Sequence, residues 1–388
     1  MSALPGIDDA LSLVLARSRP GAVEDVPVVE AAGRVLAADA RAAVDLPPFD
    51  SSAMDGYAVR AADTPGTLAV VGHAAAGRPE ERRLAAGEAI TISTGAVVPA
   101  GADAVVPVEQ TSGDLDVEVV TLGENIRPRG GDVRAGDVVV ERGVRLGPPQ
   151  VGALAAVGLA VVRCARRPRV AVLATGTELR PPGATLAPGE IYESNSVLLT
   201  AQLAQAGATV EVLRPVADDA AATREAIAAG LEADVLITSG GVSVGPHDLV
   251  RAALAELGAE EVFWRVAVKP GKPIAFAVRG ETLVFGLPGN PVSSLVGFEL
   301  FVRPALRALQ GERDPGPRYL SGTLARAARR SPDRDQFLRA RRDGGRLEPL
   351  GGQDSHMIAR AASADALVHV PRGEGDVPEG STVGYLPI

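Results

Sequence analysis

The sequence of 388 residues is longer than one hydrophobic core usually supports, which predicts two or three domains. Hydrophobic residues make up 46% of it but aromatic residues only 3%, so the cores must consist mainly of Ala, Val and Leu, as in α/β proteins. The net charge of −9, with no long run of one sign, argues against nucleic acid or an anionic membrane as the main partner. The single cysteine, Cys164, excludes an internal disulfide and a thiolate zinc cluster.

The N-terminal segment predicts a cytoplasmic protein without a membrane span. It has no basic region, and the apolar run at residues 11–16 is too short for export or for crossing a membrane. Ile7, Leu11, Val14 and Leu15 recur at helical spacing and precede Pro20, which predicts an amphipathic first helix.

Residues 45–140 consist of short β-like runs separated by Gly and Pro, which predicts a β-rich domain. Residues 148–157 then predict a second helix, with Pro148 in its first turn. We expect this helix to pack on the first one. The β-rich segment would then be an insertion into a discontinuous helical linker domain of residues 1–44 and 141–167.

Strands and helices alternate from residue 168 onward. Strands are predicted at 170–174, 210–213, 235–238 and 263–266, and helices at 196–206, 220–229, 249–257 and 291–309. This alternation predicts a doubly wound α/β domain at residues 168–311. The helical pattern ends after Gly311, and shorter β-like runs predict a small C-terminal β domain, similar to a barrel, at residues 312–388.

Three strands of the predicted sheet run directly into glycine-rich loops. These loops contain Thr175 and Gly176, then Ser239, Gly240, Gly241, Ser243 and Gly245, and finally Gly289, Asn290 and Ser293. A ligand of an open α/β sheet binds outside the carboxyl ends of its strands, and successive loop N–H groups bind anions. A single such loop would more simply serve a tight turn and close helix packing. Three of them favour an anion-binding site, although none matches the nucleotide P-loop or the dinucleotide fingerprint.

Charged groups of both signs accompany the loops. Lys269 and Lys272 lie on a segment stiffened by Pro270 and Pro273, which fits either a solvated turn or, beside the glycine loops, an oxyanion clamp. Three carboxylates, Glu178, Asp218 and Asp248, follow strands in the same domain. Each could cap a helix, but together they are what Mg²⁺ needs to bridge protein and phosphate.

Two polar constellations lie in the β-rich insertion. The first is the segment 50–58, which has the strong turn dipeptide Asp55-Gly56. The second comprises residues 93–96 and 125–132, where hydroxyl groups, arginines and an acidic residue lie next to glycine. Each fits a simple turn. If the insertion reached over the α/β crevice, in the same subunit or in a second one, it would complete a site.

The same segments resemble the molybdopterin molybdenumtransferase family, the MoeA type related to the E domain of gephyrin. The resemblance spans nearly the whole chain and rests on seven ordered motifs, at residues 50–58, 93–96, 125–132, 175–178, 239–245, 269–273 and 287–293. It implies an elongated subunit of four domains in an L-shaped homodimer. It further implies transfer of molybdenum from molybdate to the dithiolene of adenylylated molybdopterin, with release of AMP in a Mg²⁺-assisted step.

The resemblance also implies roles for individual residues. It assigns function to Asp55, Thr94 and Asp132 in the insertion, and to Glu178, Asp218, Asp248, Lys269 and Lys272 in the α/β domain. Arg339 and Ser355 match oxyanion-binding positions, in a stretch where Asp354 departs from the family pattern, as Pro246 and His247 do before Asp248. In this interpretation the glycine loops hold the phosphates and the pterin.

Two other functions share parts of this pattern. Molybdopterin adenylyltransferases use a similar α/β module, but they need neither the insertion nor the C-terminal domain. A non-catalytic pterin-binding scaffold is the other alternative, since the gephyrin relative anchors receptors. Molybdopterin adenylyltransferase and recipient molybdoenzymes are the candidate partners.

Overall fold

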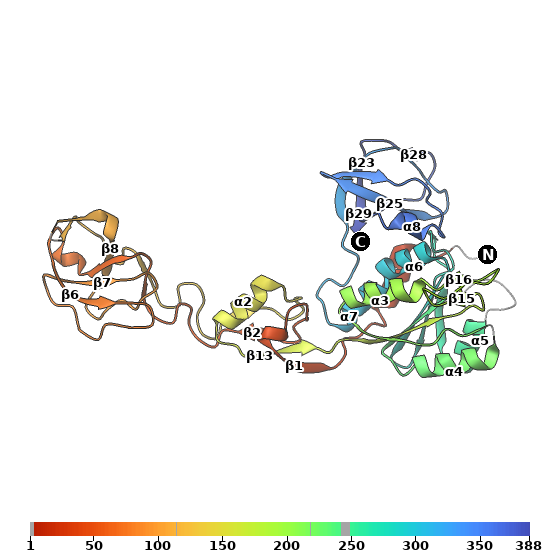
Figure 1. The fold of residues 1–388 in the computed structure, drawn as a ribbon, viewed down its shortest axis with the longest axis horizontal. Coiled ribbons are helices and arrows are strands. Elements are labelled where there is room, and N and C mark those ends of the chain that lie inside the picture. The colour runs from red at the N-terminus through yellow and green to blue at the C-terminus, as the bar shows by residue number, and fades with distance from the viewer. Residues whose placement is uncertain (1–3, 114, 218, 242–248) are drawn as a thin grey trace.

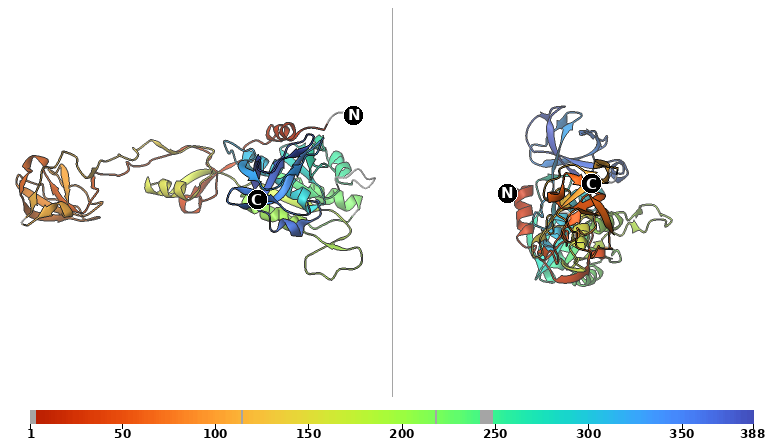
Figure 2. Two further views of the ribbon diagram at one scale, coloured as in Figure 1. Left: turned by 90° about the horizontal axis from the view of Figure 1, so that it is seen from above. Right: turned by 90° about the vertical axis from the view of Figure 1, so that its left-hand side faces the viewer.

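The computed structural model describes residues 4–113, 115–217, 219–241 and 249–388, and it has an elongated shape (Figures 1 and 2). An α/β domain and a C-terminal β domain form one end. Residues 23–165, which we call the arm, extend away from them and carry the β-rich insertion at the far tip. The predicted fold class, α/β with additional β domains in an elongated subunit, is confirmed.

The α/β domain is built on a mixed sheet of six strands. Four neighbouring strands are parallel: β17 (Thr209–Val212), β14 (Arg169–Ala174), β18 (Val235–Ser239) and β22 (Thr282–Leu287). The edge beside β22 is antiparallel, with β21 (Ala275–Arg279) and β19 (Glu260–Trp264). The expected strand at 263–266 therefore begins earlier, as β19, and runs in the same direction as the four parallel strands, while β21 alone runs against them.

Helices cover both faces of this sheet because successive side chains of a strand point to opposite faces, and the side chains on both faces are apolar. Val170, Val172 and Phe285 pack on one face, against α3 (Asn195–Gln205), α6 (Pro291–Gly297), the π-helical segment η4 (Phe298–Val302) and α7 (Arg303–Leu309). Ala171 and Leu173 pack on the other, against α4 (Ala220–Gly230) and α5 (Leu249–Glu256). Strands buried on both sides are typical of parallel sheets between helices.

The first helix, α1 (Ile7–Leu15), belongs to this core. Its apolar face, with Ile7, Ala10 and Val14, packs on η4 and α7. The expectation that it would pack on the second helix, α2 (Pro148–Ala156), is wrong, because α2 lies in the arm (Figure 1). An amphipathic pattern specifies which face is buried but not which surface covers it. The other predicted domain boundaries stay predictions.

The inner half of the arm is a small domain with its own core. It pairs β1 (Val23–Pro27) with β13 (Val161–Ala165) and β2 (Ala40–Arg41) with β12 (Val138–Val140), and η1 (Val28–Glu30) and α2 complete it. Leu36, Leu146, Leu154 and Cys164 fill the core. Burial raises the pKa of the Cys164 thiol, as expected for a packed cysteine rather than a nucleophile.

The tip of the arm is the predicted β-rich domain. Its main sheet has the order β6 (Ala69–Ala74), β7 (Glu88–Ile92), β4 (Gly56–Val59) and β8 (Ala104–Pro107). Short pairs and turns surround it: β3 (Ser51–Ser52), β5 (Gly66–Thr67), β9 (Thr111–Ser112), β10 (Asp116–Val117), β11 (Ile126–Arg127), η2 (Ala61–Asp63) and η3 (Val108–Gln110).

The C-terminal domain is a closed barrel of five strands. The order is β25 (Asp335–Asp343), β26 (Arg346–Pro349), β23 (Leu320–Leu324), β29 (Thr382–Pro387) and β27 (Ala366–Val370), which pairs again with β25. The pair β24 (Ala328–Arg329) and β28 (Asp376–Val377) and the helix α8 (Ile358–Ala361) lie outside it. From the α/β domain, β20 (Val268–Lys269) adds a short parallel pairing to β25. Within the described ranges, no helix is long and apolar enough to cross a membrane.

Candidate functional site

A cleft of about 550 Å³ lies at the carboxyl end of the central strands. In the sheet, β14 lies between β17 and β18. The connection through α3 leads from β14 to β17 on one side, and the next connection, through α4, crosses to β18 on the other side. The direction of the connections therefore changes between β14 and β18. Such a switch point is where open α/β sheets bind their ligands. Residues after β14, β18 and β22 line the cleft, together with β16 (Ile191–Tyr192), which pairs with β15 (Leu179–Arg180).

The glycine loops approach each other closely at this edge. The N–H of Thr175 donates to the carbonyl of Ser239 at 3.0 Å, and that of Gly240 donates to the carbonyl of Leu287 at 3.1 Å. Gly240 has a φ of +94°, and a Cβ there would lie 2.7 Å from the carbonyl oxygen of Thr175. Close loop packing therefore requires glycine at 240, and the same packing brings the loop N–H groups to one edge.

Asn195 joins two of these loops, and it belongs to none of the motifs that predicted the site. Its side chain is 8% exposed at the start of α3, and its Nδ2 donates to the hydroxyl of Ser239 and to the carbonyl of Gly289, both at 2.7 Å. The Gly289 carbonyl accepts only, which fixes the orientation of the amide. The available signal was a polar triplet, residues 194–196, directly before a helix.

Of the two predicted lysines, Lys269 ends β20, and Lys272 lies on the segment that joins β20 to β21. Both are exposed, and Pro273, which follows Lys272, lines the cleft. Within the part of the chain that the structure describes, neither lysine forms an ion pair. They are also the only lysines among the 39 basic residues of the sequence, a signal that the sequence analysis did not use. Lysine presents a compact charge, whereas arginine favours fixed bidentate partners.

The C-terminal domain closes one side of the cleft. Ser355 accepts a hydrogen bond from Asn290 Nδ2 at 2.9 Å, and its carbonyl accepts the N–H of Val292 at 3.0 Å. The neighbouring residues His356 and Ile358 line the cleft directly.

Arg339 lies beneath this loop rather than at the cleft. It is 1% exposed, and its guanidinium donates to the carbonyls of Gly352 at 2.6 Å, Asp354 at 3.2 Å and Met357. Burial lowers the pKa of Arg339. We expected Arg339 to contact an oxyanion. In this structure its guanidinium instead binds the backbone of the segment that carries Ser355.

Of the three predicted metal ligands, the structure describes Glu178. Its exposed carboxylate lies at the cleft, directly over Gly176, where a Cβ would be 2.6 Å from Glu178 Oε2. Asp218 and Asp248 lie outside the described residues, as do Ser243 and Gly245. Among the residues that are described, no three His, Cys, Asp or Glu side chains form a cluster able to hold a metal ion.

The predicted residues of the insertion lie at the other end of the molecule. Asp55 and Thr94 are adjacent and exposed, and the N–H of Thr94 donates to Asp55 Oδ1 at 2.7 Å. Asp132 is separate from them, near the base of the insertion, where its N–H donates to the carbonyl of Leu46 at 3.0 Å. The length of the arm keeps all three away from the cleft of their own chain (Figures 1 and 2).

The other predicted site residues collect around the cleft. Ser293 differs from the others because it is buried within α6, where its N–H donates to the carbonyl of Asn290. Seven of the predicted site residues line the cleft: Thr175, Glu178, Ser239, Gly241, Pro273, Gly289 and Asn290.

Comparisons with known proteins agree with this arrangement along the whole chain. Residues 6–158 match the MoeA N-terminal region (domain I and II), residues 171–308 a probable molybdopterin binding domain, and residues 321–388 the MoeA C-terminal region (domain IV). The molybdopterin molybdenumtransferase 2 of Mycobacterium tuberculosis is 40% identical over 377 residues, which cover 92% of this chain and 93% of the relative. The molybdopterin molybdenumtransferase of Haemophilus influenzae is 37% identical over 382 residues, 95% of this chain and 94% of the relative.

The chain belongs to the MoeA family. Its fold agrees with a solved structure as well: the molybdopterin biosynthesis MoeA protein from Pyrococcus horikosii superposes with a TM-score of 0.84 at 32% identity, covering 100% of this chain and 99% of that one.

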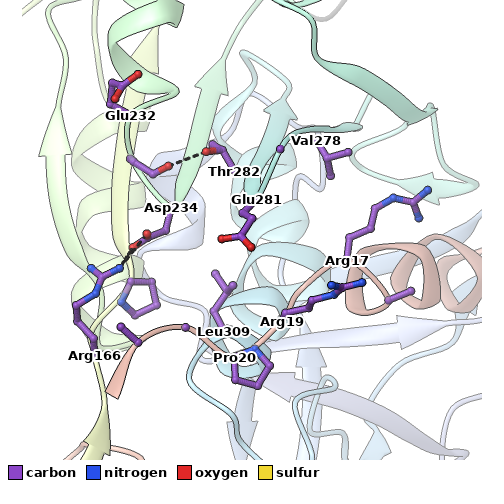
Figure 3. Close-up of a pocket in the computed structure, with 16 residues that line it drawn as sticks. Arg17, Arg19, Pro20, Arg166, Glu232, Asp234, Val278, Glu281, Thr282 and Leu309 are labelled. Carbon is purple, nitrogen blue, oxygen red and sulfur yellow. Dashed lines mark hydrogen bonds and ion pairs between the residues drawn. The ribbon is translucent and has the colours of Figure 1, made fainter. Parts of the chain in front are cut away.

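A second cavity of this MoeA-family chain, about 500 Å³ in volume, lies at the opposite, amino end of the strands (Figure 3). Arg19, Pro20, Arg166 and Leu309 surround it where the arm meets the α/β domain. Arg166 is committed to Asp234, with two contacts of 3.0 Å from one guanidinium nitrogen. Because none of the glycine loops reaches this end of the sheet, we assign the functional site to the cleft and not to this cavity.

Gly240→Ala should lower the stability of the α/β domain by about 1–3 kcal/mol more than Gly183→Ala, because the new methyl group meets the carbonyl of Thr175. Gly183 is the matched control: its φ is +89°, but open space surrounds it. The measurement is urea unfolding followed by the fluorescence of Trp264, the single tryptophan, which lies on β19 of the same sheet. Equal losses in the two variants would show that the loops do not depend on this close approach.

Proposed function

We propose that this chain is a molybdopterin molybdenumtransferase, which inserts molybdate into the dithiolene of adenylylated molybdopterin and releases AMP. The observation that carries the proposal is the cleft that three glycine loops form at the switch point of the sheet, with Pro273, the neighbour of Lys272, in its wall, in a chain whose relatives bear that name over 93% and 94% of their lengths. The substrates are two anions that repel each other, so bringing them together is the main catalytic task.

Each group at the cleft has a part in this task. The ammonium groups of Lys269 and Lys272 neutralise molybdate as it approaches the dithiolene. The loop N–H groups around Gly240 and Gly289 hold phosphate oxygens and the pterin, and Ser355 offers a hydroxyl from the C-terminal side. Arg339 and Asn195 act through other groups, since Arg339 holds the Ser355 segment and Asn195 joins the loops after β18 and β22.

We also propose that the reaction uses Mg²⁺. The support is Glu178, a carboxylate at the cleft with the hard oxygen ligands that Mg²⁺ prefers. Mg²⁺ binds through one or two carboxylates together with substrate phosphates, so a single described carboxylate fits it, and Asp218 and Asp248 stay predicted ligands. When bound there, it would supply neutralisation of the pyrophosphate charge.

The long arm supports a homodimer with composite sites. Asp55, Thr94 and Asp132 cannot reach the cleft of their own chain, so we propose that the arm of one protomer completes the cleft of the other. There the Asp55 carboxylate would orient the leaving AMP or activate water. We further expect a cytoplasmic protein that receives substrate from molybdopterin adenylyltransferase and delivers cofactor to recipient molybdoenzymes.

The test of the whole proposal is an incubation with adenylylated molybdopterin, molybdate and Mg²⁺. Release of AMP that depends on molybdate, together with reconstitution of a molybdoenzyme that lacks its cofactor, is the expected result. Consumption of ATP with molybdopterin alone would instead assign adenylyltransferase activity. Binding of the nucleotide with neither signal would assign a scaffold.

Lys269→Ala and Lys272→Ala should each lower kcat/KM for molybdate by about 100-fold, because a fixed positive charge at the developing negative charge is lost. The measurement is AMP release as a function of molybdate concentration. Arg224→Ala is the control, since Arg224 is an exposed cation on α4 whose partner is Glu256 at 3.6 Å. Unchanged kcat/KM in both lysine variants would contradict the oxyanion role.

Asp55→Asn should abolish turnover without unfolding the tip of the arm, because the amide oxygen still accepts the N–H of Thr94. A heterodimer of one Asp55→Asn chain and one Lys269→Ala chain should regain about half of the wild-type activity, since one of its two composite sites is intact. Two different affinity tags allow this heterodimer to be purified. An inactive heterodimer would show that Asp55 and Lys269 serve the same site within one chain.

A further inference from the structure

The joint between the arm and the α/β domain is built around one buried carboxylate, Glu312, which directly follows α7. Its side chain is 2% exposed, and three arginines surround it: Arg145 at 2.6 Å, Arg318 at 2.8 Å and Arg307 at 4.0 Å. Arg145 belongs to the arm, Arg307 to α7, and Arg318 to the segment that leads into the C-terminal barrel. The arm, the α/β domain and the linker to the barrel therefore each contribute an arginine to one carboxylate.

The guanidinium of Arg145 is fixed from both sides of the joint. Besides Glu312, it donates to the carbonyl of Gly33 in the arm at 2.6 Å and to the side-chain oxygen of Gln310 in the α/β domain at 3.3 Å. Gln310 is itself held by the carbonyls of Ala206 and Leu306. Because the donors of a guanidinium lie in one plane, bonding on both sides sets the direction of the arm and not only its distance.

An open pocket adjoins this joint. The cavity of about 500 Å³ between Pro20, Arg166 and Leu309 lies on the same joint (Figure 3). The N–H of Gly21 reaches the carbonyl of Leu309 at 2.9 Å across its edge. Because this pocket opens to solvent, the hydrogen bonds and ion pairs of the charged cluster hold the joint beside a gap in the packing.

We propose that Glu312 is a positioning residue, which fixes the angle of the arm and thereby places Asp55 over the cleft of the second protomer. This inference rests on the proposed function for its catalytic consequence. The angle itself is a property of one chain. A small rotation at the joint is amplified along the arm (Figure 1), so the tip depends on it most strongly.

The first experiment measures the angle without reference to activity. Val29 in the arm and Val197 on α3 are 86% and 60% exposed, and both are replaced by cysteine and spin-labelled, while the native Cys164 is buried. Pulsed electron resonance then gives the distance between the labels. We expect Glu312→Gln to broaden and shift this distance, because three arginines lose their common carboxylate. Arg145→Gln, which leaves Glu312 paired with Arg318 and Arg307, should do the same with the α/β domain intact.

The matched control is Glu141→Gln. Glu141 and Arg313 form an ion pair across the same joint, but their side chains are 58% and 60% exposed, so solvent screens it. This variant should keep the wild-type distance. Unchanged distances in both Glu312→Gln and Arg145→Gln would overturn the proposal, and so would an equal change in Glu141→Gln.

The second experiment places Glu312→Gln in one chain of the heterodimer of Asp55→Asn and Lys269→Ala chains. In the Lys269→Ala chain, Glu312 lies at the base of the arm that serves the intact site. There we expect kcat to fall by about tenfold or more, with little change in KM, because the arm acts on bound substrate. In the Asp55→Asn chain the substitution should have little effect. Equal losses in both placements would overturn the proposal, whereas an inactive parent heterodimer would contradict the composite site and leave the distance test decisive.

Discussion

The close approach of Thr175 and Gly240 is the constraint on which the cleft depends. Two parallel strands end side by side, and their loops can meet only because position 240 carries no side chain at a φ of +94°. This contact brings the backbone of both loops to the switch point, and the amide of Asn195 then joins Ser239 to Gly289. The site is thus made largely of backbone held by packing, which costs little reorganisation when an anion binds.

Local signals in the sequence were sufficient for this part of the structure. A β-branched run followed by glycine specifies both a buried strand and its turn, so the glycine loops and the sheet edge could be predicted together. The burial of Arg339 could not be predicted from local signals of this kind. Arg339, Arg341 and Arg342 lie on one strand with nothing in the sequence to separate them, yet Arg339 is 1% exposed and the other two are exposed. Burial in a barrel depends on partners distant in the chain, and so does the surface on which α1 packs.

The choice between arginine and lysine follows the work each cation does in this chain. Arginines bond to groups that stay in place, such as the Asp234 carboxylate for Arg166 and the carbonyls of the Ser355 segment for Arg339. Planar donors suit fixed partners of this kind. A substrate that binds and dissociates needs a cation that stays well hydrated when the substrate is absent, and an exposed ammonium group meets that requirement. Both lysines of this chain are exposed in this way.

An elongated subunit creates a mechanical problem that a compact enzyme does not have. In the proposed composite site, groups at the tip of the arm must be placed to within a fraction of an ångström over the cleft of the second protomer, because catalysis is lost with small misplacement. A buried carboxylate bound by three arginines supplies this precision through direction-dependent bonds, at the cost of desolvating the Glu312 carboxylate. Such a cluster adds little net stability, so its place at the joint is better explained by the geometry that it imposes.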